Sequence, residues 1–202
     1  MKKAITAIAF VLISISLSAQ SYYRSYDHHD ISVSYGLFTP SQFWDVNTTI
    51  LNDSFPSQLY VSDNYKGSGA AALTYRHMFK NENMLWGVSA GMSNASWQIY
   101  NIGINEGELK RTYYTLTIDW QYRWRNQGVV QMYSGIDLGY TFGQQTFTPT
   151  ESGAAATTSN FGQLGYQLNA IGARFGKKFG GYVEFGYGYK GIVNFGLSLQ
   201  LF

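Results

Sequence analysis

Histidines are the residues of this chain best suited to metal binding or to acid–base chemistry, and there are three of them, His28, His29 and His77. A serine hydrolase needs a histidine placed to accept the serine proton, and no His-x-Ser element stands beside His77. The run His28-His29-Asp30 offers possible metal ligands, but no partner cluster completes a site. The chain also has no cysteine, which excludes a thiolate site. We expect no catalytic triad, no metal site and no cofactor.

Charged residues of both signs form the second candidate group. They lie in segments that alternate between polar and apolar residues, and they are Arg76, Asp119, Arg123, Asp137 and Glu184. The three acidic residues could be interpreted as an acid–base set. The stronger interpretation is structural, because opposite charges on the polar faces of neighbouring strands pair with one another inside a narrow barrel. Arg174 or Lys190 could join these pairs.

The elements that carry these residues are predicted to be β-strands, because almost the whole chain after Gln20 has a period of two. The clearest segment spans residues 112–124, with apolar and aromatic residues on one face and polar ones on the other. Segment 163–175 has an uncertain phase, which a β-bulge would explain. We predict an all-β chain of about eight antiparallel strands, over residues 31–37, 71–79, 86–93, 112–124, 130–142, 163–175, 183–189 and 193–201.

Connections of alternating length are the next signal. Short polar turns are predicted at residues 80–83, 125–128 and 177–181, and longer loops at 40–67, 98–110 and 147–162. The connection at Lys190-Gly191 would be short as well. Short turns at one end and longer loops at the other are typical of outer-membrane barrels.

The N-terminus has the form of a secretory signal peptide. Lys2 and Lys3 precede an apolar run of about 14 residues, and Ser18-Ala19-Gln20 offers a cleavage site. That run is shorter than the ~20 residues that a membrane-spanning helix needs. We therefore predict a signal peptide over residues 1–19 and one barrel domain over 20–202, exported by a Sec-type route. No later apolar stretch is long enough to span a membrane as a helix, so membrane insertion would require a closed barrel.

Composition favours a barrel whose apolar face contacts lipid. Charged residues are 13% of the chain, about half of the ~25% in soluble domains. Aromatic residues are predicted near both membrane boundaries, with Trp86 and Trp124 at one end and Tyr113, Tyr140 and Trp97 at the other. A net charge of +2 gives no support to nucleic-acid binding. A secreted, soluble, lipocalin-like ligand-binding barrel remains the alternative, because it alternates in the same way.

A resemblance to a known family adds to this interpretation. Residues 171–176 (IGARFG) and 181–191 (GYVEFGYGYKG) resemble the end of uncharacterised small outer-membrane β-barrel proteins of the OmpA/OmpX type. The resemblance implies a closed up-and-down barrel of eight strands in the outer membrane of a Gram-negative cell. The terminal Phe202 resembles the signal that the barrel-assembly machinery reads, although it is one step out of phase with the apolar residues before it.

For function we expect a structural or surface-interaction role in contact with outer-membrane lipid and lipopolysaccharide, and no enzyme activity. Eight strands leave an interior filled by side chains, so no transport pore is expected. The long first loop carries aromatic residues suited to contacts with glycans, lipopolysaccharide or protein, unless they fold back onto the barrel rim: Phe43, Trp44, Phe55, Tyr60 and Tyr65. A lipid A-modifying outer-membrane enzyme is a further alternative.

Overall fold

The computed structural model describes residues 29–39, 60–79, 83–101, 103–151 and 154–201. The predicted signal peptide, the loop residues Phe43, Trp44 and Phe55, and the terminal Phe202 lie outside the described residues, as does the side chain of Tyr60. Within the described ranges, no helix is long and apolar enough to cross a membrane.

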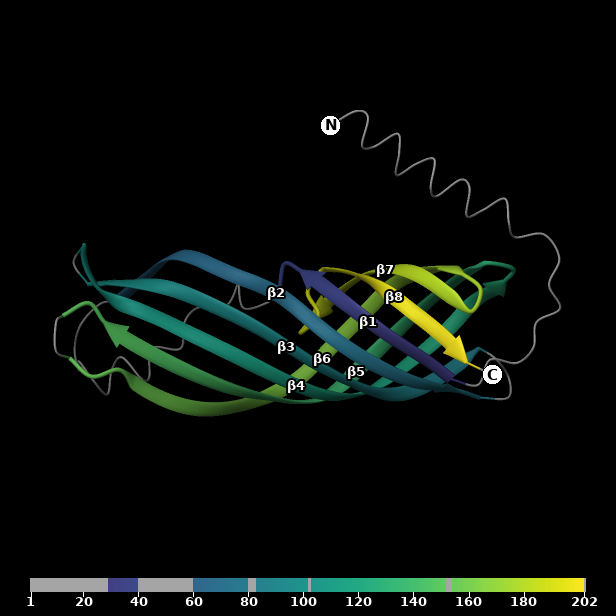
Figure 1. Cartoon of the computed structure of the whole chain (residues 1–202), viewed down its shortest axis with the longest axis horizontal. Coiled ribbons are helices and arrows are strands. Elements are labelled where there is room, and N and C mark those ends of the chain that lie inside the picture. Colours follow the sequence, from purple (N-terminus) through teal and green to yellow (C-terminus); the bar gives the residue numbers. More distant parts are fainter. Residues whose placement is uncertain (1–28, 40–59, 80–82, 102, 152–153, 202) are drawn as a thin grey trace, which may run out of the picture.

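Eight antiparallel strands form a closed barrel in chain order, with β1 and β8 paired to complete the ring (Figure 1). The prediction of eight strands is therefore confirmed. Their bounds are β1 His29–Leu37, β2 Tyr60–Met78, β3 Met84–Asn101, β4 Ile104–Gln127, β5 Val130–Pro149, β6 Thr157–Gly176, β7 Phe179–Gly188 and β8 Val193–Leu201.

Alternation along each strand places apolar side chains outside the ring and polar ones inside it. In β4, Ile118 and Trp120 are 62% and 49% exposed, whereas Asp119 and Gln121 are 1% and 4% exposed. Leu138 lies opposite Ile118 on β5 and is 50% exposed. The distribution is the reverse of a soluble barrel, in which the apolar residues fill the interior.

The predicted bulge in β6 is present. The pairing of β6 with β7 shifts register between Asn169 and Ile171, and the pairing with β5 shifts at the same level. Before the bulge the buried positions include Gln167 and Asn169, and after it they include Arg174. One extra residue therefore changes which positions face inward, and this explains why the phase of this segment was uncertain from the sequence.

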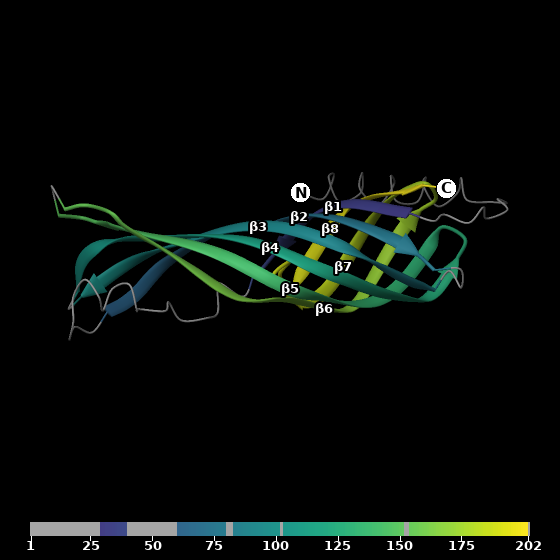
Figure 2. The same cartoon turned by 90° about the horizontal axis from the view of Figure 1, so that it is seen from below.

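Strand lengths are very unequal. β2 to β6 have 18 to 24 residues, whereas β1, β7 and β8 have 9 or 10. The long strands extend past the short ones at the end away from the C-terminus, as both views show (Figures 1 and 2). We call this extension the projecting sheet, comprising residues 60–69, 94–101, 104–112, 143–149 and 157–166.

Much of the chain predicted as long loops is therefore strand. β3 ends at Asn101 and β4 begins at Ile104, and these two residues are partners, so residues 98–110 are almost entirely paired. β5 and β6 likewise occupy both ends of the predicted loop 147–162, and β2 begins within the predicted loop 40–67. The prediction of loops was wrong at these positions because polar composition there reflects water on the outer face, not an absence of pairing.

The two faces of the long strands exchange polarity where the projecting sheet begins. On β3 the exposed Met92 is followed on the same face by Asn94, while the inward Trp97 is only 6% exposed. The inward side chains of the projecting sheet form an apolar core of Ala95, Trp97, Ile99, Leu109 and Phe147, with Tyr65 and Tyr113 packed against it. Trp97 and Tyr113 were predicted near a membrane boundary, and that placement was wrong because Trp97 belongs to this core and Tyr113 packs against it.

Candidate functional site

The interior of the barrel centres on a buried ion pair between β2 and β4. Arg76 donates from Nε to Asp119 Oδ1 at 2.5 Å and from Nη2 to Asp119 Oδ2 at 2.9 Å. Both residues are almost fully buried, at 4% and 1% exposure. Two parallel charge-assisted bonds fix the guanidinium and the carboxylate in one relative orientation. Arg76 thus links strands that are not neighbours in the ring.

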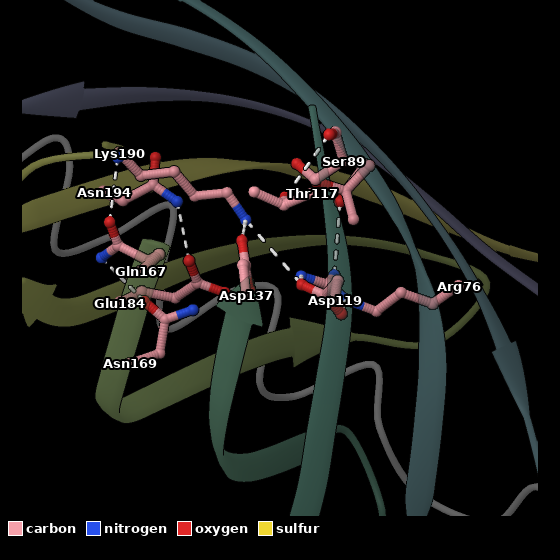
Figure 3. A network of polar contacts seen from close by, with 12 residues as sticks. Arg76, Ser89, Thr117, Asp119, Asp137, Gln167, Asn169, Glu184, Lys190 and Asn194 are labelled. Atoms are coloured by element: carbon pink, nitrogen blue, oxygen red, sulfur yellow. Dashed lines mark hydrogen bonds and ion pairs between the residues drawn. The ribbon is translucent and has the colours of Figure 1, made fainter. Parts of the chain in front are cut away.

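A lysine from the β7–β8 turn enters the same interior. Lys190 Nζ lies 2.8 Å from Asp137 Oδ2 and 3.9 Å from Asp119 Oδ2. Figure 3 shows Lys190 reaching Asp137, with Arg76 on the other side of Asp119. The backbone of the turn is held too, because Lys190 N–H donates to Gln167 Oε1 at 2.9 Å. The turn therefore closes over the interior, with Gly191 at a φ of 91° that favours glycine.

A second ionic group lies toward the end of the barrel where β1 begins and β8 ends. Arg123 Nη2 is 3.6 Å from Asp30 Oδ2, and Arg76 Nη1 is 3.8 Å from Asp30 Oδ1. Gln200 donates to Asp30 Oδ2 at 3.0 Å. Asp30 thus joins the first, second, fourth and last strands. From the sequence, Asp30 was considered only as a possible metal ligand beside His28 and His29, although its alternation with the apolar Ile31 was a signal that it faces inward.

Glu184 is held differently from the other carboxylates. Tyr133 donates its hydroxyl to Oε1 at 2.9 Å, and Asn194 Nδ2 donates to Oε2 at 2.7 Å. Its close contacts are therefore with neutral donors, and not with the paired cation that we had expected. Nothing in the alternating pattern distinguishes these two kinds of partner, because both occupy inward positions.

All five charged residues selected from the sequence lie inside the barrel. Asp30, Arg174 and Lys190 are buried there as well. Four acidic and four basic side chains are thus buried in the ring and balance one another: Asp30, Asp119, Asp137 and Glu184, with Arg76, Arg123, Arg174 and Lys190. Because each acidic side chain contacts a cation or two donors, the arrangement fills and cross-links the interior.

The histidines of the described residues lie elsewhere. His29 and His77 occupy outward positions on β1 and β2, so neither can activate a nucleophile among the buried charges. Across the described part of the chain, no group of three or more histidine, cysteine or acidic residues is placed to hold a metal. His28 lies outside the described residues.

The projecting sheet holds one buried cation among its aromatic residues. The Arg111 guanidinium lies 5.5 Å from the Trp97 ring centroid and 5.6 Å from that of Phe161. Its Nε donates to Gln145 Oε1 at 3.1 Å. Tyr65, the only described side chain among the five predicted loop-contact residues, has its ring centroid 5.5 Å from Trp97. Tyr65 therefore packs onto this core and is not a free loop contact, in agreement with the alternative that loop aromatics fold back onto the barrel.

The outer wall of the ring decides the type of barrel. Exposed aliphatic and aromatic residues cover it, among them Leu116, Ile118, Leu138 and Phe195, while the charges are buried inside. In lipid a closed ring satisfies every strand hydrogen bond, and an apolar outer wall removes the cost of contact with hydrocarbon. This chain is a β-barrel of the outer-membrane type. A soluble lipocalin-like barrel would have the opposite distribution, so that alternative was wrong.

Comparison with known proteins gives a limited likeness. No protein-family model matches the chain, and no curated protein matches it. The crystal structure of Ail, the attachment invasion locus protein of Yersinia pestis, in complex with the heparin analogue sucrose octasulfate, is similar over 85% of this chain and 95% of that chain, with 16% identity and a TM-score of 0.40. The backbone structure of Ail in a phospholipid bilayer nanodisc covers 87% of this chain and 100% of that chain, with 16% identity and a TM-score of 0.39. Because the identity and the TM-scores are this low, the fold is assigned from the closed ring of eight strands and not from these neighbours.

Proposed function

We propose that this outer-membrane barrel anchors the projecting sheet at the cell surface, where the sheet binds an extended segment of another polypeptide. The observation that carries the proposal is the free edge of β6. Residues 157–165 pair with β5 on one side, and among the described residues nothing pairs with their other side. Bonding on that side begins at Tyr166, whose carbonyl accepts from Tyr189 N–H at 2.9 Å, and pairing with β7 begins at Gln167. An unpaired strand edge offers backbone donors and acceptors to an added strand.

The two edges of the projecting sheet differ in how they are protected. On β2, residues 60–69 contain Lys66 and two register shifts, one between Asp63 and Lys66 and one between Gly67 and Ala70. Charged residues and bulges discourage edge pairing. On β6, residues 157–166 contain no lysine or proline, and their pairing with β5 is regular. The β6 edge is therefore the better place for a partner strand.

In this proposal the ring has no transport or enzymatic role. The cross-linked charges fill its interior, and the carboxylates that could act as acids or bases are each bound by buried partners. Outer-membrane lipid and lipopolysaccharide are its surroundings, and the barrel-assembly machinery recognises its last strand.

Two adjacent proline substitutions test the edge. Successive backbone N–H groups of β6 point alternately toward β5 and toward the open side, so one of Ser159→Pro and Asn160→Pro removes an outward donor and the other removes a ladder hydrogen bond. The barrel, held in nanodiscs, would be titrated with short peptides that alternate apolar and polar residues. We expect the wild type to bind these peptides. The proline variant that removes the N–H on the open side of β6 should lose this binding while the barrel stays folded.

A shortened projecting sheet provides a second test of the proposal. A chain shortened at the β3–β4 and β5–β6 tips keeps the ring and loses the free edge. If neither the wild type nor any variant binds peptides, or if the trimmed chain binds as the wild type does, the recognition role is wrong. Steady ion conductance of the wild type in a planar bilayer would contradict the filled interior.

A further inference from the structure

Two histidines that are distant in sequence lie side by side on the outer wall. His29 is the direct partner of His77 in the β1–β2 pairing, near the end of the barrel where β1 begins and β8 ends. Their ring centroids are 5.2 Å apart, and the ring planes are inclined by 48°. Both side chains are half-buried, so solvent or lipid head groups can reach them.

Tyr75 orients one of the two rings. His29 Nδ1 is 2.8 Å from the Tyr75 hydroxyl, and the two rings are stacked with centroids 5.8 Å apart. A histidine that binds a metal usually donates its other ring N–H to a nearby acceptor, which fixes the tautomer and the ring orientation. In the tautomer that carries its proton on Nδ1, His29 donates to the tyrosine oxygen, and its Nε2 lone pair is then free to bind a cation.

We propose that His29 and His77 form a two-histidine site for a divalent transition-metal ion of the copper, nickel and zinc class. Two imidazoles on one ion, with metal–nitrogen bonds of about 2.0–2.1 Å and a tetrahedral angle, have ring centroids about 5 Å apart. The observed centroid separation of 5.2 Å agrees with this. Imidazole nitrogen suits copper, nickel and zinc, and does not suit calcium or magnesium.

The surroundings explain how two protein ligands are enough to form a site. Trp86 is the partner of His77 on β3, and Tyr75 contacts His29, so the pair lies beside two aromatic side chains of the kind enriched at a membrane–water boundary. Water and lipid phosphate oxygens are available at that depth to complete the coordination. No inward charge of the barrel takes part, so the site is independent of the buried ion pairs and of the projecting sheet.

Copper titration of the barrel tests the site. The protein, without a polyhistidine tag, would be placed in phosphatidylcholine nanodiscs and titrated with Cu²⁺, followed by electron paramagnetic resonance and by quenching of tryptophan fluorescence. We expect one saturable site with two nitrogen ligands. His29→Gln and His77→Gln should each weaken binding at least about tenfold, and Tyr75→Phe should weaken it roughly tenfold through the lost orientation of His29.

His28→Gln is the matched control, because His28 adjoins His29 in sequence and should leave binding unchanged. Loss of binding in His28→Gln with retention in His77→Gln would assign the ion to the sequence neighbours and overturn the proposal. Absence of saturable binding in the wild type, or wild-type binding in the His29→Gln/His77→Gln double variant, would overturn it as well. Gel migration before and after heating reports whether each variant has folded.

Discussion

Asp119 and Asp137 lie directly opposite each other across β4 and β5, with both carboxylates inside the barrel. Like charges at such a position are destabilising unless cations compensate them. Here Arg76 binds Asp119 from β2, and Lys190 lies 2.8 Å from Asp137 and 3.9 Å from Asp119. The register of β4 against β5 at this point therefore depends on Arg76 from β2 and on Lys190 from the β7–β8 turn.

The Arg76–Asp119 pair should behave as one unit in a double-mutant cycle. Removing one member of a buried ion pair leaves a charge without its partner, at a cost of about 3–5 kcal/mol. We expect Asp119→Asn and Arg76→Gln each to lower the free energy of unfolding in lipid by this amount, and the double variant to lose less than the sum. Unfolding by urea in vesicles measures it, and strict additivity would mean that the two side chains do not depend on each other.

Depth along the outer wall should determine the cost of an added charge. Leu138 and Gln144 both face outward on β5, but Leu138 lies in the apolar band and Gln144 lies beyond it. Arginine at the bilayer midplane of a barrel costs about 2–4 kcal/mol, and about 0–1 kcal/mol near the interface. We expect the larger loss of folding free energy for Leu138→Arg and the smaller for Gln144→Arg. Equal costs for the two variants would contradict this position of the membrane.

The core of the projecting sheet should be separable from the ring. Phe147 is 2% exposed in that core, and a Phe→Ala change of this kind costs about 3–5 kcal/mol. Because the ring has its own pairing and its own buried charges, Phe147→Ala should speed hydrogen exchange in residues 95–111 and 143–149 while the amides of β1 and β8 keep their protection. Thr148→Ala, at the adjacent exposed position, is the control and should change little. Uniformly faster exchange would instead indicate one cooperative unit.

Closure of the ring should make the folded protein resistant to detergent. A closed barrel has no free edge within the membrane, so the unheated chain should migrate differently from the heated chain on a denaturing gel. It should also stay in the membrane fraction during mild alkaline extraction. Release of the protein into the soluble fraction would contradict insertion in the membrane.

Alternation in the sequence was sufficient to predict most of the ring. Residues such as Ile118 and Asp119 report opposite environments one position apart, and this local signal depends only on the geometry of a single strand. The same signal failed for residues 98–110, because the projecting sheet has water outside and an apolar core inside. A polar outer face and a loop have similar compositions, so these residues were predicted as a loop. Trp97 was misplaced because the outer face becomes polar beyond Met92, and an aromatic residue there lies in the inward core.

Local sequence, then, determined the number of strands and the inward face of Arg76, Asp119, Arg123, Asp137 and Glu184, because a period of two needs no knowledge of neighbours. Only the tertiary structure decided the partners. Arg76 reaches Asp119 across an intervening strand, Glu184 accepts from Tyr133 and Asn194, and His29 meets His77. These pairings depend on register, on the bulge in β6 and on the curvature of the closed ring, which are properties of all eight strands together.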